Sequence, residues 1–176
     1  LCLLALMLTG SRSGYLALLG AAGVFVLIMN PRLVPVGLVV LVLMIPFLPQ
    51  SLVARLSTIG KDTSSTYRIR IWEGVLRMVD DFWIQGIGMG PSAFTIIYRD
   101  YANTNAMSAV HSHNVLLSVL VETGIGGFVA IFAYIFKSFK AGIATAINPI
   151  DMEIKFFSAA AVASLTGFFI TSLVEY

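Results

Sequence analysis

Residues 114–136 read NVLLSVLVETGIGGFVAIFAYIF, an apolar run whose only charged residue is Glu122. A helix that crosses the hydrocarbon core of a bilayer needs about 20 mostly apolar residues, and this run supplies them. Further apolar runs cover residues 1–9, 14–29, 33–48 and 156–174. The sequence therefore predicts an all-α fold, a polytopic transmembrane helical bundle whose first helix is incomplete.

The composition of the whole chain is that of a protein that faces lipid. Of the 176 residues, 58% are hydrophobic and 11% are charged, whereas soluble domains carry about 25% charged residues. The mean hydropathy is +0.91, and a net charge of +2 is too small to indicate nucleic-acid binding. The single cysteine, Cys2, cannot form an internal disulfide. No basic segment or cleavage site precedes the first run, so we expect a fragment of a longer protein rather than a signal peptide.

The apolar runs divide the chain into three parts. Residues 1–49 hold transmembrane helices, residues 50–113 form a long loop, and residues 114–176 hold two transmembrane helices with a polar connection. Each spanning helix changes the side of the membrane, so Arg12 and the long loop are predicted on one face and the connection on the other. Lysines favour the cytoplasm for the connection, which makes the long loop external. They are Lys137, Lys140 and Lys155.

Residues 67–83 of the loop are predicted to form an amphipathic helix. Its apolar residues recur at helical spacing, namely Trp72, Val75, Leu76 and Val79. On a helical wheel Arg68 lies near the centre of this apolar face, whereas Arg70 lies near the centre of the polar face. An arginine on an apolar face must pair with a carboxylate, bind an anion, or extend its guanidinium to water.

Arg12 and Arg68 are candidates for binding a phosphorylated substrate, because a guanidinium holds phosphate oxygens through a planar fork of donors. Structural alternatives remain open for both. Arg12, between two apolar runs, would hold a lipid phosphate or fix the topology. Arg68 would pair with a buried carboxylate. Arg70 and Arg77 are interpreted as residues of a solvated face.

Two histidines precede the run of residues 114–136, in the order His111-Ser112-His113-Asn114. A neutral imidazole, whose ordinary pKa is about 6.5, suits general-base catalysis at neutral pH. Zinc binding is not supported, because no third histidine or cysteine completes a ligand set. A structural role for both histidines is the alternative.

Two further features lie near the membrane boundary. Glu122 is an acidic residue at membrane depth and so a functional candidate, although pairing with an arginine is the simpler interpretation. Residues 86–90 read GIGMG. A dinucleotide site would require a βαβ unit around this stretch, so we interpret it as a tight turn that ends the amphipathic helix.

Three segments, in order along most of the chain, resemble the O-antigen ligase and O-antigen polymerase family. Residues 8–12, LTGSR, resemble the family's Ser-Arg segment. Residues 68–72, RIRIW, followed by the glycine turn of residues 86–90 and by Phe94, resemble its Arg-x3-Trp segment and glycine turn.

The third segment fits the ligase pattern H-N-x9-G-x-x-G. The pattern falls on His113, Asn114, Gly124 and Gly127. Two features depart from the family: Trp83 stands where a proline commonly precedes the glycine turn, and His111 is an additional histidine that competes for the role of base.

The resemblance implies a GT-C-like glycosyltransferase of the bacterial plasma (inner) membrane, with its active site on the external, periplasmic face. The donor would be a glycan linked to undecaprenyl diphosphate, and the acceptor a sugar hydroxyl on a lipid core or on another glycan, with membrane lipid as a further partner. No cofactor, metal or nucleic acid would be involved. The implied roles are catalytic base for His113, diphosphate binding for Arg12 and Arg68, support for Asn114, His111 and Glu122, and turns for Gly88, Gly90, Gly124 and Gly127.

Other functions share these features. An O-antigen or capsule polymerase of the same family carries the same motifs. A transporter or flippase of lipid-linked glycans would use the arginines to hold the anion, and His113 would then be dispensable. In a purely structural membrane subunit, neither the arginines nor the His-Asn pair would have a chemical role.

Overall fold

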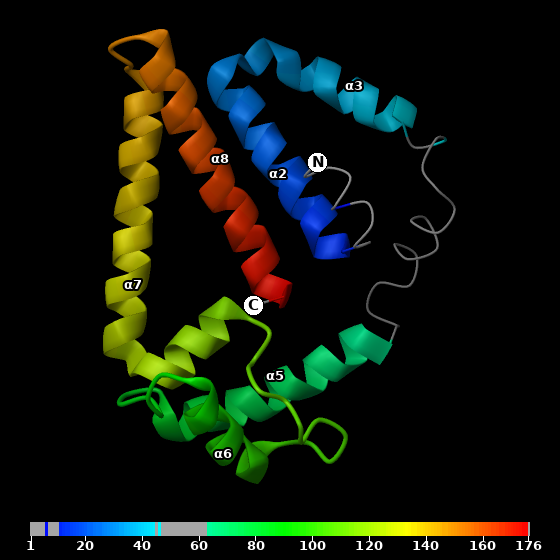
Figure 1. Ribbon diagram of the computed structural model, residues 1–176, viewed down its shortest axis with the longest axis vertical. Helices are drawn as coiled ribbons and strands as arrows, with labels where there is room; N and C mark the ends of the chain where they lie inside the picture. Colours follow the sequence, from blue (N-terminus) through cyan, green and yellow to red (C-terminus); the bar gives the residue numbers. More distant parts are fainter. Residues whose placement is uncertain (1–5, 7–10, 45, 47–62, 176) are drawn as a thin grey trace. The chain divides into compact units, whose positions relative to one another are not determined.

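The computed structural model describes residue 6, residues 11–44, residue 46 and residues 63–175 (Figure 1). Every regular element in these ranges is a helix, which confirms the predicted all-α fold. Within the same ranges, three helices are long and apolar enough to cross a membrane, as expected of a polytopic membrane protein. They are α2 (Arg12–Met29), α7 (Val115–Ile147) and the Met152–Leu173 part of α8 (Met152–Glu175).

Two other expected spans stay predictions. The run of residues 1–9 lies outside the described residues, apart from Leu6. In the run of residues 33–48, a 3-10 turn (η1, Pro31–Leu33) leads into α3 (Val34–Met44), which has 11 residues and is too short as described to cross the hydrocarbon core. Residues 45, 47 and 48 lie outside the described residues.

The chain consists of two compact units. The first contains Leu1–Thr58 and Phe136–Thr171, and the second contains Ile59–Ile135 and Ser172–Tyr176.

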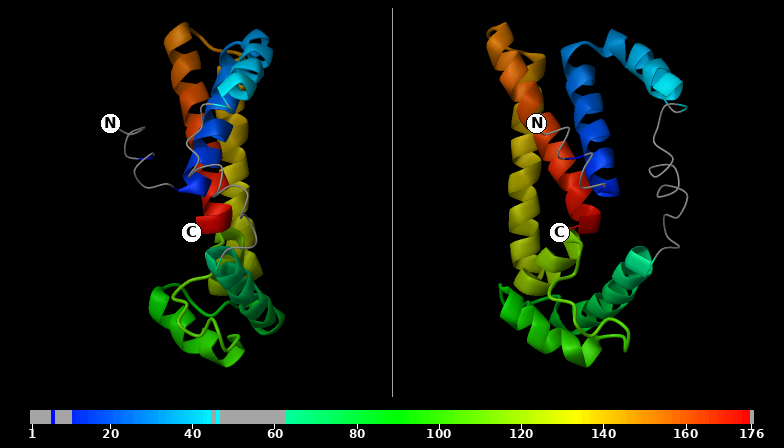
Figure 2. Two further views of the ribbon diagram at one scale, coloured as in Figure 1. Left: turned by 90° about the vertical axis from the view of Figure 1, so that its right-hand side faces the viewer. Right: turned by 45° about the vertical axis from the view of Figure 1, so that its right-hand side comes forward.

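In the first unit, α2 and α8 lie side by side (Figures 1 and 2). Small residues permit this approach, as is usual where membrane helices pack closely. The Ile170 side chain occupies the space that a Cβ on Gly20 would need, and a Cβ on Gly167 would lie 3.3 Å from the Ala17 carbonyl oxygen. At the end of α2, Lys155 Nζ donates to the Met29 carbonyl oxygen at 3.3 Å, a group that the helix end leaves without an intrahelical partner.

α7 is broken at Gly124, where φ is 65° and ψ is −176°. The break separates a helix of residues 115–123 from a helix of residues 125–147, and it falls at Gly124, one of the glycines for which the family resemblance implies a turn. With a rise of about 1.5 Å per residue, the second helix is about 34 Å long, close to the thickness of a hydrocarbon core of about 30 Å. We therefore take residues 125–147 as the membrane-spanning part of α7.

The polar connection before α8 is shorter than expected, since α7 ends at Ile147 and α8 begins at Met152. Lys137 and Lys140, predicted in the connection, are exposed residues within α7. The sequence-based boundary ended the helix at its first charged residue. A lysine can nevertheless remain in a membrane helix, because its long apolar stem carries the ammonium group toward water.

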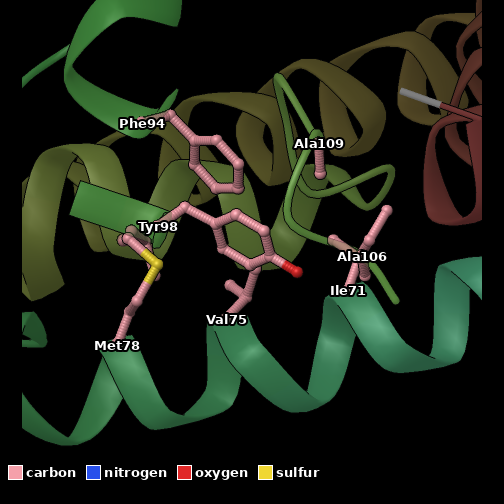
Figure 3. Close-up of a cluster of buried hydrophobic side chains, with 8 residues drawn as sticks. Ile71, Val75, Met78, Phe94, Tyr98, Ala106 and Ala109 are labelled. Carbon is pink, nitrogen blue, oxygen red and sulfur yellow. The ribbon is translucent and has the colours of Figure 1, made fainter. Parts of the chain in front are cut away.

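In the second unit, α5 (Thr63–Phe82) and α6 (Pro91–Tyr101) enclose a buried hydrophobic cluster (Figure 3). Its largest members are Ile71, Val75, Met78, Phe94 and Tyr98. The Phe94 and Tyr98 rings stack with their centroids 5.1 Å apart. Gly74 allows α6 to approach α5, because a Cβ there would lie 2.8 Å from Tyr98 Cε2 and 3.0 Å from the Tyr101 carbonyl oxygen.

The buried face of α5 differs from the predicted one. The buried residues are Ile71, Gly74, Val75 and Met78, whereas Leu76 and Ile69 are exposed. The centre of the buried face is therefore displaced by about one residue, roughly 100° around the helix. The sequence pattern merged this face with a second, exposed apolar stripe that includes Ile69 and Leu76. Consequently Arg68 lies beside the buried face, not at its centre.

Candidate active site

His111 and His113 lie together in the loop that leads into α7. Their ring centroids are 4.1 Å apart, with the ring planes tilted by 53°. His113 has a φ of 54°, and no other non-glycine residue in the described ranges has a positive φ. For a residue with a Cβ this conformation costs about 1–2 kcal/mol, so neighbouring contacts must hold the backbone in place.

Ser112, between the two histidines, makes those contacts. Its Oγ donates to the Asn114 carbonyl oxygen at 2.7 Å and accepts from the Asn114 N–H at 3.1 Å. Ser118 Oγ lies 2.7 Å from Ser112 Oγ and donates to it, because the Ser112 hydrogen is already committed to Asn114. Both serines are buried, so their hydroxyls are satisfied away from water. The sequence pattern assigned no role to either serine.

Asn114 caps the helix of residues 115–123. Its Oδ1 accepts from the N–H groups of Leu116 and Leu117 at 3.0 and 3.1 Å, as an N-cap side chain does. Its Nδ2 donates to the Leu173 carbonyl oxygen at 2.9 Å. These contacts make Asn114 a residue that positions the histidine loop. Direct orientation of His113 by the Asn114 side chain stays a prediction.

The spacing of the H-N-x9-G-x-x-G pattern corresponds to one structural element. The helix of residues 115–123 separates the Asn114 cap from the Gly124 break, a length of about 14 Å. Gly127 does not form the expected turn, because it lies within the helix of residues 125–147. It faces Thr123, whose Oγ1 occupies the space of a Cβ at that position. The pattern therefore fixes the distance between the histidine loop and the break in α7.

The glycine turn after α5 is a tight turn, as predicted. Gly86, Gly88 and Gly90 all have positive φ values, of 69°, 93° and 121°. Only glycine adopts such values without a steric penalty. The turn reverses the chain between Phe82, the last residue of α5, and Pro91, the first residue of α6.

This turn docks on the break in α7 through main-chain hydrogen bonds. They run from Ile87 N to Val121 O at 2.8 Å, from Gly88 N to Glu122 O at 3.0 Å, and from Ile125 N to Trp83 O at 2.7 Å. Two glycines make the approach possible. A Cβ on Gly86 would lie 2.5 Å from the Glu122 carbonyl oxygen, and a Cβ on Gly124 would overlap the Ile84 carbonyl oxygen.

Trp72 connects α5, which carries Arg68, to the loop that carries His111 and His113. Its Nε1 donates to the Ser112 carbonyl oxygen at 2.9 Å, one residue before His113. Arg68 lies one helical turn before Trp72 on the same side of α5, because residues four apart are neighbours on a helix surface. The structure therefore brings the Arg-x3-Trp segment and the His-Asn segment together within the second unit.

The arginines of α5 differ in their surroundings. Arg68 and Arg70 are both half-buried, so burial alone does not separate them. Arg77 is exposed, as predicted, and one of its terminal nitrogens donates to the Tyr101 carbonyl oxygen at 2.8 Å. A cation at this place also complements the negative end of the α6 dipole. Arg77 therefore has a structural role at the end of α6.

Arg12 is the first residue of α2, in the first unit. Ser11 caps this helix, because its Oγ accepts from the Gly14 N–H at 3.2 Å. Arg12 is half-buried at the positive end of the helix dipole, which favours anions. The other predicted site residues belong to the second unit.

Two tyrosines of α6 were not singled out from the sequence. The Tyr98 hydroxyl is buried without a hydrogen-bond partner. Burial of the hydroxyl is the main cause that raises the pKa of Tyr98 to about 12, and the nearby Tyr67 is a smaller one. The exposed hydroxyl of Tyr101 donates to Asp81 Oδ2, and this hydrogen bond raises the pKa of Tyr101. No sequence pattern identifies a polar atom that becomes buried within an apolar cluster.

Two remaining site predictions concern acidic and metal-binding groups. Within the described ranges, no group of three or more His, Cys, Asp or Glu side chains could hold a metal ion. Glu122 is half-buried near the end of the helix of residues 115–123. Its pairing with an arginine stays a prediction.

A family model described as O-antigen ligase matches residues 1–132, three quarters of the 176-residue chain. The match includes the Ser-Arg segment, α5, the glycine turn, the histidine loop and the break in α7. Comparison with curated proteins gave no match, and comparison with solved structures gave none.

Proposed function

The chain belongs to the O-antigen ligase family, and from this premise we propose that it transfers a glycan from undecaprenyl diphosphate to a sugar hydroxyl at the outer face of a bacterial plasma membrane. The family supports glycan ligation by a multi-pass membrane protein. The donor, the acceptor and the side of the membrane are parts of the proposal.

The observation that carries the proposal is the hydrogen bond from Trp72 Nε1 to the Ser112 carbonyl oxygen. It joins the helix that bears Arg68 to the loop that bears His113. Transfer from a lipid diphosphate requires both a cation for the leaving group and a base for the acceptor. The second unit offers one of each on neighbouring segments.

We assign the base to His113. The acceptor hydroxyl attacks the anomeric carbon, its proton passes to the imidazole, and the bond from the anomeric carbon to the diphosphate oxygen breaks. A neutral imidazole can accept this proton at neutral pH. The strained backbone of His113, held by Ser112 and Asn114, supports this role because such strain is often found at functional sites.

We assign the diphosphate to Arg68 and Arg12. Charge builds up on the diphosphate oxygens as the glycosidic bond breaks, and a guanidinium neutralises it through charge-assisted hydrogen bonds. With two arginines in this role the reaction requires no metal ion. Addition of a chelator should therefore leave transfer unchanged, and loss of transfer with EDTA would contradict the assignment.

The outer-face location rests on the direction of the helices. α2 and α8 pack against each other in opposite directions, since Gly20 faces Ile170 while Lys155 reaches Met29. The end of α2 at Met29 lies beside the start of α8 at Lys155, and Arg32 follows closely in the chain. Basic residues favour the cytoplasm, so this end is assigned to the cytoplasmic side. The opposite ends of α2 and α8 are then external. α7 ends at Ile147, just before α8 begins at Met152, so a single crossing by α7 makes its start external as well.

The experiment that tests the function is transfer by the full-length protein in liposomes, with a defined undecaprenyl-diphosphate donor and a panel of acceptors. Product on a lipid-core sugar would identify a ligase, and product on a second glycan would identify a polymerase. Movement of the donor between leaflets without any product would support a transporter instead and contradict the proposal.

The arginines of α5 provide a matched pair of variants. Arg68→Ala should lose transfer, whereas Arg70→Ala should retain most of it. Loss of a hydrogen bond to a charged group costs about 1.5–3 kcal/mol, which corresponds to a loss of donor affinity of about 10-fold to more than 100-fold. Arg68→Lys should recover only part of the loss, because lysine lacks the planar fork. An active Arg68→Ala beside an inactive Arg70→Ala would reverse the assignment.

A further inference from the structure

The turn between α5 and α6 exposes three large apolar side chains. Trp83 is 48% exposed, Ile84 60% and Met89 71%. None of them belongs to the buried cluster of the second unit or packs against it. Three such residues in so short a stretch expose more apolar surface than a loop in water would normally tolerate.

Main-chain hydrogen bonds fix the position of this turn. The Trp83 carbonyl oxygen accepts from Ile125 N–H at 2.7 Å, and Ile125 is the first residue of the membrane-spanning part of α7. The Ile87 and Gly88 N–H groups add two further bonds to the residues just before the break. Trp83 is therefore held beside Ile125, where the membrane-spanning part of α7 begins.

We propose that Trp83, Ile84 and Met89 form an interfacial anchor that inserts into the boundary between lipid head groups and acyl chains, in the leaflet that Ile125 enters. Tryptophan is enriched at this depth, because its ring is apolar and its indole N–H remains near water. Ile125, which bonds to Trp83, and Val129, one turn further along α7, are also exposed and apolar, so the apolar residues of the turn lead into those of the membrane-spanning helix. This continuity favours lipid over a protein partner as the occupant.

The charges beside the anchor determine the kind of lipid contact. Asp80 and Asp81, in the last turn of α5, are both exposed. Carboxylates at this place do not attract anionic head groups, so the anchor binds by insertion of apolar side chains. Its contact with lipid is accordingly insensitive to salt. The inference rests on the membrane-spanning character of α7 and does not depend on the proposed transfer reaction.

Quenching of tryptophan fluorescence by brominated lipids tests the anchor. The full-length protein is placed in phosphatidylcholine vesicles that carry bromine either near the head group or deep in the acyl chains. The difference between the parent protein and Trp83→Phe isolates the signal of Trp83. We expect shallow bromines to remove most of this signal, deep bromines to remove less, and aqueous iodide to remove little, at low and at high salt alike.

A second variant protects the test against a local effect of the substitution. Met89→Trp, introduced into the Trp83→Phe protein, should restore quenching by shallow brominated lipid. Strong quenching by iodide with none by brominated lipid would show a side chain in water and overturn the proposal. Protection from both quenchers would show that protein covers the turn, and would overturn it equally. Neither outcome bears on glycan transfer, which is measured separately.

Discussion

His113 illustrates how single residues carry the site. Its left-handed backbone is held by the buried Ser112, whose side chain bonds to both main-chain groups of Asn114, the residue that follows His113. The histidine and its neighbour Asn114 could be identified from the sequence because they form a spaced motif. Ser112 could not, since a buried serine has the same local sequence appearance as an exposed one, and only the folded loop brings Ser118 to its hydroxyl.

Tyr98 allows a prediction on stability. Its hydroxyl is buried without a hydrogen-bond partner, and leaving such a group unpaired costs about 1–3 kcal/mol. Tyr98→Phe should therefore leave the free energy of unfolding unchanged or increase it. Tyr101→Phe, which removes the hydrogen bond to Asp81, is the matched control and should not stabilise. Thermal unfolding in detergent at neutral pH measures both, and marked destabilisation by Tyr98→Phe would reveal a partner for the hydroxyl.

The raised pKa of Tyr98 adds a dependence on pH. A pKa of about 12 in the folded protein, against about 10 in the unfolded chain, means that the neutral phenol stabilises the fold. This contribution is complete below about pH 10 and is lost as the pH rises through about 12. Tyr98→Phe should reduce the loss of folding stability at alkaline pH. If that loss is the same in the variant and the parent, burial of an ionisable group at this position is contradicted.

At the scale of the elements, the glycine turn and the break in α7 act as one joint. Gly86→Ala and Gly124→Ala each place a Cβ against a carbonyl oxygen at a positive φ. The backbone term alone costs about 1–2 kcal/mol, and the overlap adds to it. Gly126→Ala is the control, because its Cβ would meet nothing within 4 Å. Limited proteolysis should cut the first two variants faster than the parent and cut the control at the parental rate. Parental resistance of all three variants would contradict the close packing of the glycine turn on the break in α7.

The elements also show where the sequence was sufficient. The glycine turn was predicted from its three glycines, because glycines mark backbone conformations that other residues avoid. The break at Gly124 was expected only through the resemblance, which implies a turn there. The face of α5 was predicted wrongly, because the helix carries two apolar stripes and only α6 reveals that Gly74, not Leu76, belongs to the buried one. The end of α7 was placed too early, because Lys137 and Lys140 look like the end of a span when the helix around them is unknown.

For the whole molecule, the central structural prediction is its orientation in the membrane. Ser92 and Asn105 are exposed in the second unit, and Asn148 is exposed in the connection between α7 and α8. With Cys2 replaced, single cysteines at Ser92 or Asn105 should react with an impermeant maleimide added outside intact cells, and a cysteine at Asn148 should react only after the cells are opened. Labelling of Asn148→Cys alone in intact cells would invert the topology.

The central claim, that this chain is a glycan transferase with His113 as its base, is tested most directly by the transfer rate of His113→Asn in the liposome assay. Asparagine tolerates the left-handed conformation of His113 better than alanine, so the loop should stay folded, and donor binding provides the check. Positioned general bases contribute about 10²–10⁴-fold to rates. We predict a loss of that size in His113→Asn, with near-parental transfer in the control His111→Asn. Near-parental transfer by His113→Asn, with the loss falling on His111→Asn instead, would contradict the account.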